Sequence, residues 1–155
     1  MSILNVVAGL SIAGCLAVPA TAADNPMSFS IEVSLSPKAA AKLAAMKERI
    51  EAAALWYGDP TPAARKRADE TGNINLGSET LRLPGTGGRL DFTGKPVKTD
   101  RIAWVAKREV KLNLNVYSAR QGGPDNVLDC TFFDDDIRIA RAKPVAVLCK
   151  LIGEK

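Results

Sequence analysis

Two cysteines in the second half of the chain are the residues best placed for covalent chemistry. Cys130 and Cys149 each lie in a short run rich in β-branched or aromatic residues, which is typical of a strand. In such a strand Cys130 shares a face with Leu128 and Phe132, so we expect both sulfurs to point into a core. There is no CxxC motif to indicate a redox pair. We therefore predict a structural disulfide, worth about 3 kcal/mol for a loop of this size.

Histidine is absent from the chain. This excludes Ser-His-Asp and Cys-His catalysis and removes the commonest transition-metal ligand. The glycine-rich stretch 84–88 fails as a phosphate loop, because GxGxxG would need glycine at Leu90 and a P-loop would need Ser or Thr at Pro96. We accordingly predict no catalytic residue, no bound metal and no cofactor.

Three consecutive carboxylates, Asp134 to Asp136, offer oxygen ligands of the kind that calcium prefers. The run lacks the EF-hand spacing and its closing glutamate, so a solvated turn is the favoured interpretation. A carboxylate-based hydrolase stays open as an alternative, since the separation of two carboxyl groups cannot be read from sequence.

The cluster Arg65, Lys66 and Arg67 is the candidate partner-binding site. It falls in a predicted loop over residues 58–72, and the glycine-rich stretch 84–96 is expected to be a second recognition loop. Such charges commonly serve only solubility, and the alternative is contact with an anionic lipid, glycan or protein.

Three aromatic side chains allow two interpretations. Trp56, Tyr57 and Trp104 could line a carbohydrate or peptide groove. Aromatic residues at strand positions more often belong to a core, which is the interpretation we favour. The formal net charge is +4, with the basic residues spread along the chain, so a nucleic-acid partner is not predicted.

The first 22 residues have the composition of an export signal. Residues 3–18 are apolar and uncharged, Pro19 follows, and Ala-Thr-Ala at 20–22 suits signal peptidase. The apolar run is short for a membrane span, which needs about 20 residues. We predict a signal peptide over 1–22, a mature domain over 23–155 without a transmembrane span, and a periplasmic or secreted location. The alternative is a lipobox at residues 12–15, with the protein lipid-anchored through Cys15.

Alternation of apolar and polar residues predicts most of the remaining elements. Ser36 and Pro37 should start a helix that runs to about residue 47, followed by a strand that ends at Tyr57, although a longer helix remains an alternative. Further strands are expected over 28–35, 74–76, 81–83, 101–107, 110–118, 127–133 and 145–152. Short runs separated by turns indicate a mainly β fold.

The expected architecture is an antiparallel β-sandwich, immunoglobulin-like or transthyretin-like, with one short N-terminal helix and one disulfide. This resemblance concerns architecture alone, because no residue motif carries it. The transthyretin-like hydrolases depend on histidines that this chain lacks.

The function expected from these observations is that of a non-catalytic binding module of the bacterial envelope. Its expected partner is an envelope protein or an anionic glycan. The alternatives are the histidine-free hydrolase and the lipoprotein.

Overall fold

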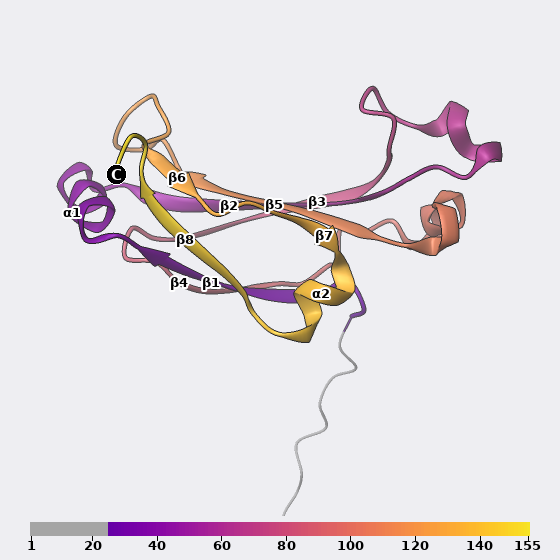
Figure 1. Cartoon of the computed structure of the whole chain (residues 1–155), viewed down its shortest axis with the longest axis horizontal. Helices are drawn as coiled ribbons and strands as arrows, with labels where there is room; N and C mark the ends of the chain where they lie inside the picture. The colour runs from indigo at the N-terminus through magenta and orange to yellow at the C-terminus, as the bar shows by residue number, and fades with distance from the viewer. Residues whose placement is uncertain (1–24) are drawn as a thin grey trace, which may run out of the picture.

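The computed structural model describes residues 25–155, which form two four-stranded sheets packed face to face (Figure 1). The first sheet has the order β4 (Gly88–Phe92), β1 (Phe29–Leu35), β8 (Val145–Leu151) and β6 (Leu128–Cys130). The second has the order β3 (Ile74–Pro84), β2 (Arg49–Gly58), β5 (Lys111–Ser118) and β7 (Phe133–Asp136). The predicted mainly β fold is therefore confirmed.

One strand pair departs from the expected antiparallel pattern. β1 and β8 run parallel, with Ile31 opposite Val145 and Leu35 opposite Cys149, whereas the other paired strands are antiparallel. The choice between an immunoglobulin-like and a transthyretin-like sandwich stays a prediction. The predicted signal peptide and the lipobox at Cys15 lie outside the described residues.

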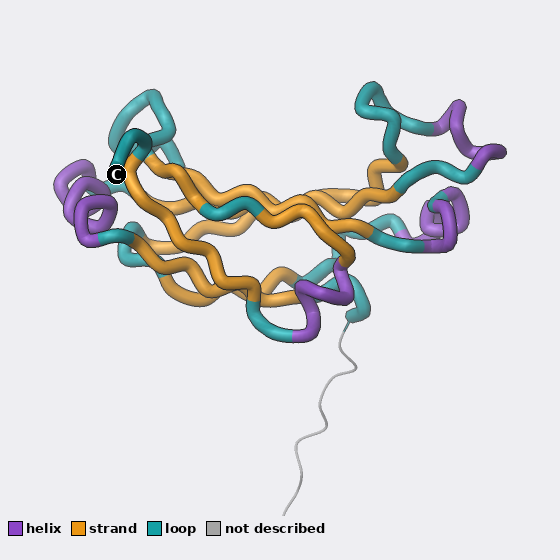
Figure 2. The backbone as a smooth tube through the Cα atoms, viewed as in Figure 1, coloured by secondary structure: helices purple, strands orange, loops and turns teal. Residues whose placement is uncertain are grey.

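The helices are short and gather at the ends of the sheets (Figure 2). The α-helices are α1 (Pro37–Met46) and α2 (Ile137–Ala142), and the 3₁₀ helices are η1 (Pro62–Arg67), η2 (Thr99–Trp104) and η3 (Ala106–Arg108). α1 lies at one end of the long axis and the 3₁₀ helices at the other. No helix among residues 25–155 has the length and apolar character needed to cross a membrane.

The predicted change from helix to strand after residue 47 is confirmed. Ser36 Oγ accepts a hydrogen bond from the Ala39 N–H at 3.1 Å, and Pro37 occupies the first turn. Lys47 then takes a left-handed conformation with φ 52°, and its N–H bonds back to the helix, which is a standard helix end. β2 begins two residues later and buries alternate side chains.

Two apolar runs that we predicted as separate strands belong to the single strand β3. Residues 74–76 and 81–83 are joined through Gly77, where the pairing with β2 shifts at a bulge. Gly77 has φ +135°, and a Cβ there would lie 2.5 Å from the Pro96 carbonyl oxygen. β3 turns at residues 85–87 into β4, so the stretch 84–96 contains a strand and is not the continuous loop we expected.

The predicted strand over 127–133 is corrected, because the chain leaves the first sheet after Cys130. β6 pairs with β8, whereas β7 pairs with β5 in the second sheet. The three aspartates therefore lie in β7 and not in the expected turn. Phe132 falls at the crossing and is 60% exposed instead of facing the core.

The predicted strand over 101–107 is wrong, because this segment forms η2 and η3. Val105 is buried, and Ile102 and Trp104 are partly buried, where this segment covers the end of the second sheet, so it needs no strand partner. Val105 makes a single bridge to Pro60, and it packs against Gly58 so closely that a Cβ there would lie 2.4 Å from Val105 Cγ1.

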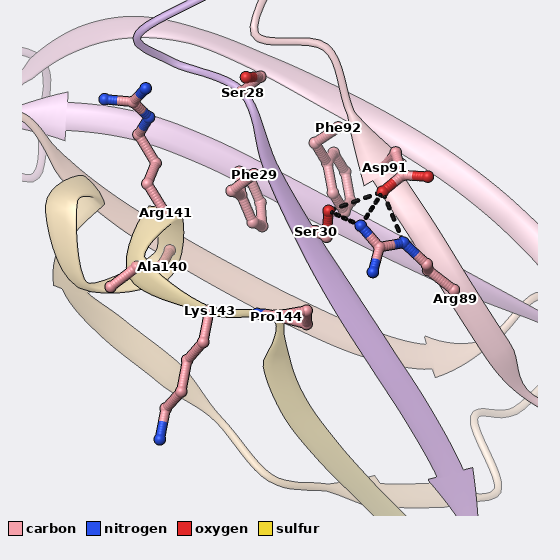
Figure 3. Close-up of a pocket in the computed structure, with 11 residues that line it drawn as sticks. Ser28, Phe29, Ser30, Arg89, Asp91, Phe92, Ala140, Arg141, Lys143 and Pro144 are labelled. Carbon is pink, nitrogen blue, oxygen red and sulfur yellow. Dashed lines mark hydrogen bonds and ion pairs between the residues drawn. The ribbon is translucent and has the colours of Figure 1, made fainter. Parts of the chain in front are cut away.

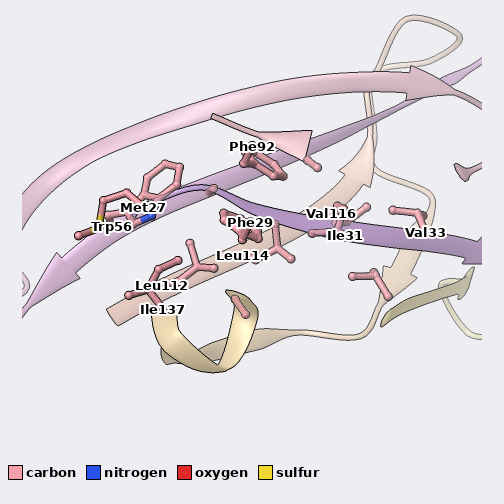
Figure 4. Packing of buried hydrophobic residues seen from close by; sticks show 14 of the residues in the cluster. Met27, Phe29, Ile31, Val33, Trp56, Phe92, Leu112, Leu114, Val116 and Ile137 are labelled. Carbon is pink, nitrogen blue, oxygen red and sulfur yellow. The ribbon is translucent and has the colours of Figure 1, made fainter. Parts of the chain in front are cut away.

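The core between the sheets is centred on three aromatic rings (Figure 4). Phe29 and Phe92 stack with ring centroids 4.7 Å apart, and Trp56 meets Phe29 edge-on at 5.8 Å. These geometries are the favoured ones for aromatic pairs. Ile137, at the start of α2, is buried with the same cluster.

The predicted disulfide is present between Cys130 and Cys149, whose Cα atoms are 4.0 Å apart. The two residues face each other across β6 and β8. Cys149 is fully buried and Cys130 packs against the core. The bridge therefore fastens a three-residue edge strand to the interior of its sheet.

Candidate functional site

The predicted partner-binding residues Arg65, Lys66 and Arg67 occupy η1. Thr61 caps this helix, because its Oγ1 accepts a hydrogen bond from the Ala64 N–H at 3.2 Å. Ala64 is the buried residue of η1, which leaves the three cationic side chains exposed. The loop expected from sequence is thus an ordered turn that presents all three charges to solvent.

Trp104, at the end of η2, lies beneath this turn. The Arg67 guanidinium carbon is 4.3 Å from the centre of the Trp104 ring, and that of Arg101 is 5.9 Å away. The Thr61 N–H donates to the Trp104 carbonyl oxygen at 2.7 Å, which ties η1 to η2. Cations over an indole face are attracted by its quadrupole, so Trp104 orients Arg67 and Arg101.

The fold places η2 and η3 at the same end of the molecule as η1 (Figure 1), and these two helices carry further cations. Within the described chain, none of these cations takes part in an ion pair. The nearby Asp59 is already bound to Lys111 at 2.8 Å. We call the following set the basic end: Arg65, Lys66, Arg67, Arg101, Lys107 and Arg108.

The three aromatic residues do not form a common groove. Trp56 is fully buried in the core, which confirms the favoured interpretation for that residue. Tyr57 points to the outer face of the second sheet, where its hydroxyl donates to Asp134 Oδ1 at 2.6 Å. Trp104 is half-buried at the basic end.

The carboxylates of β7 line a shallow polar cavity of about 350 Å³ together with Tyr57, Glu109 and Lys111. Burial, and then the hydrogen bond and charge of Asp134, raise the pKa of Tyr57 to about 12. The bound guanidinium of Arg138 lowers the pKa of Asp136, in spite of the opposing effect of burial. Asp136 also caps α2 by accepting from the Arg138 N–H at 2.8 Å.

Two groups of this cavity have shifted pKa values that favour one protonation state each, Asp136 as a carboxylate and Tyr57 as a neutral phenol. A glycoside hydrolase needs one carboxyl group held protonated by a raised pKa, whereas the pKa of Asp136 is lowered. Tyr57 stays neutral at physiological pH and serves as a hydrogen-bond donor. Within residues 25–155, no group of three or more His, Cys, Asp or Glu residues is placed to hold a metal ion.

The basic cluster could be found from sequence because its three cations are consecutive. The contribution of Trp104 could not, because no spacing in the sequence connects it to Arg67.

Comparison of the chain with protein-family models, with curated proteins and with solved structures found no match.

Proposed function

We propose that this protein is a non-catalytic binding module of the bacterial envelope. It docks on an acidic partner, a protein or an anionic glycan, through the basic end. The observation that carries the proposal is the exposed triad Arg65, Lys66 and Arg67, ordered by η1 and supported by Trp104. Exposed unpaired charges raise the association rate with an oppositely charged surface.

The proposed location is the periplasm or the cell exterior. Disulfides persist in oxidising compartments and are rare in the cytosol, and the Cys130–Cys149 bridge is consistent with that setting. The uncharged apolar start of the chain and the Ala-Thr-Ala at 20–22 support removal of residues 1–22. Tethering through Cys15 is the alternative route to the same side of the membrane.

A pull-down from envelope extract tests the docking surface. The wild-type protein and an Arg65→Ala/Lys66→Ala/Arg67→Ala variant serve as baits at low and at high salt. We expect the variant to capture less of the partner, and salt to weaken capture by the wild type, because ions screen exposed charges.

A variant with the same loss of charge at the opposite end provides the control. Lys38, Lys42 and Lys155 are exposed near α1 and the C-terminus, and their replacement by alanine should leave capture unchanged. Equal capture by the wild type and the η1 variant would show that the basic end is irrelevant.

The hydrolase alternative rests on the cavity that Tyr57 shares with the β7 carboxylates. Turnover of a polysaccharide by purified protein, abolished by Asp134→Asn alone, would establish it and displace the binding proposal. We expect no turnover, because Asp134 is held by the Tyr57 hydroxyl and Asp136 by Arg138.

A further inference from the structure

A concave surface runs along α2 and meets the basic end at Lys107 and Arg108, without including η1. It consists of two adjoining cavities of about 480 and 290 Å³, which lie between α2 and the incoming segment 26–30. Arg141 lines both cavities and marks their junction. Figure 3 shows the larger one, with Arg141 and Lys143 coming from the end of α2 and Arg89 from β4. We call this surface the α2 groove.

The α2 groove carries an excess of positive charge. Arg89 is bound to Asp91 at 2.9 Å, and Arg138 to Asp136 at 2.6 Å. The groove is also lined by four cations that take part in no ion pair within residues 25–155, and by the single further carboxylate of Glu109. These four cations are Lys107, Arg108, Arg141 and Lys143.

The wall of the larger cavity is polar and held in place. Ser30 Oγ accepts from Arg89 Nη2 at 2.6 Å and donates to Asp91 Oδ1 at 2.6 Å, while Arg89 Nε donates to the same carboxylate oxygen at 2.9 Å (Figure 3). These bonds fix the guanidinium and leave its remaining N–H groups to bind a ligand. Ser28 adds a hydroxyl whose oxygen can accept a further bond.

The floor of this cavity offers little apolar contact. Phe29 and Phe92 lie beneath it, yet they are only 5% and 1% exposed. Stacking of nucleic-acid bases requires exposed aromatic faces, which this floor does not provide. A peptide is recognised mainly through apolar side chains that become buried in pockets of its partner, and the closed floor of this cavity leaves no space for such side chains.

We infer that the α2 groove binds an acidic polysaccharide, a chain of sugars that carries carboxylate or sulfate groups. Guanidinium groups bind such anions in bidentate fashion, and serine hydroxyls match the hydroxyl groups of the sugar ring. Two cavities joined at Arg141 fit an extended ligand that carries charges at intervals better than they fit a small ion. This inference does not rest on docking through η1.

Calorimetric titration at low salt, with size-defined heparin and oligogalacturonate fragments as probes, tests the inference. We expect both charged fragments to bind and uncharged dextran fragments of equal length not to bind. An Arg141→Ala/Lys143→Ala variant should bind about tenfold more weakly, since each lost contact is exposed and modest in strength. Both side chains are exposed, so the variant should fold, and equal thermal midpoints check this.

A Lys38→Ala/Lys42→Ala variant, which removes the same charge from α1, should bind like the wild type. Charge reversal by Lys143→Glu alone should weaken binding further than Lys143→Ala. The α2 groove shares Lys107 and Arg108 with the basic end but contains none of the η1 triad. The η1 triple variant should therefore keep its glycan affinity.

Several results would overturn the inference. One is failure of the wild type to bind either charged fragment. Another is binding by the Arg141→Ala/Lys143→Ala variant that is as tight as that of the wild type. The third is a loss of affinity in the Lys38→Ala/Lys42→Ala control as large as that in the α2-groove variant. Tighter binding of a polyglutamate peptide or a single-stranded oligonucleotide of matched charge would assign the groove to another class of partner.

Discussion

At the scale of single residues, Glu48 is a buried carboxylate that joins two distant parts of the chain. Its oxygens accept hydrogen bonds from the N–H groups of Arg49 at 2.8 Å, Gln121 at 3.1 Å and Gly122 at 2.7 Å. Burial acts to raise the pKa of Glu48, but the three donors outweigh it and the pKa is lowered. The charged side chain therefore holds the β5–β6 connection against the start of β2.

Replacing Glu48 by glutamine should reduce the free energy of unfolding by about 2–3 kcal/mol near pH 7, because hydrogen bonds to a charged group are lost. The folded-state pKa lies below the ordinary value of 4.5, so this stabilisation is present above that pH and is lost as pH falls through the folded pKa. Urea unfolding of both proteins at about pH 7 and about pH 3 measures the effect.

The difference between the two proteins should shrink at the lower pH. Glu32→Gln, at an exposed carboxylate on β1, is the control and should change little at either pH. A Glu48→Gln cost that is the same in acid and at neutrality would mean that the charge is not responsible.

Gly77 allows a second prediction, with Gly88 as its matched control. Both have positive φ, +135° and +127°, but a Cβ at Gly77 would meet Pro96 whereas Gly88 faces open space. Gly88→Ala should cost about 1–3 kcal/mol from backbone strain alone. Gly77→Ala should cost more, because β3 must also move away from the Pro96 carbonyl group. Equal denaturation midpoints for the two variants would refute the close approach.

At the scale of elements, strict alternation of apolar and polar residues was the sequence pattern that best predicted strands. It predicted β1, β5 and β8, and the cap formed by Ser36 and Pro37 predicted α1. The strand predicted over 101–107 is wrong because the apolar residues of this run cover a sheet end and are partly or fully buried there, and alternation does not distinguish that from strand pairing. The crossing at residues 131–132 was missed for a similar reason, since neither strand length nor sheet membership is encoded in a local pattern.

The disulfide that joins β6 to β8 gives a testable prediction at the scale of elements. Alkylation without reductant, followed by peptide mapping, should find Cys130 and Cys149 unlabelled and joined. The Cys130→Ala/Cys149→Ala variant should lose about 2–5 kcal/mol of unfolding free energy, the usual cost for a small domain. Full labelling of both thiols in freshly isolated protein would contradict the bridge.

At the scale of the whole molecule, the candidate sites depend on contacts between segments far apart in sequence. The basic end joins residues 61–67 to 101–108, and the α2 groove joins segment 26–30 to β4 and α2. The triad at 65–67 is visible in the sequence. The position of Trp104 beneath it is not, nor is the placement of Arg89, Arg141 and Lys143 on one surface. Strand order decides these contacts, and no local pattern reports it.

Processing of the N-terminus is a prediction for the chain as a whole. The intact mass of protein recovered from its host should correspond to a chain that begins at Ala23, because signal peptidase accepts Ala-Thr-Ala at 20–22. A diacylglyceryl mass on Cys15 would assign the lipoprotein route. An unprocessed chain would contradict both routes and the proposed location.

The parallel pairing of β1 with β8 has a consequence for how the molecule comes to be folded. The first described strand lies between β4 and β8, and residues Ile31 to Leu35 find their partners on one side only at positions 145–149. A chain that emerges from a ribosome or a translocation channel with its N-terminus first must therefore leave one edge of β1 unpaired until residues 145–149 have been delivered. Contacts of such long range slow folding and prolong the exposure of an unpaired strand edge. Completion of the first sheet is thus a late step, and shortening the chain within β8 should leave a product that aggregates instead of a smaller domain.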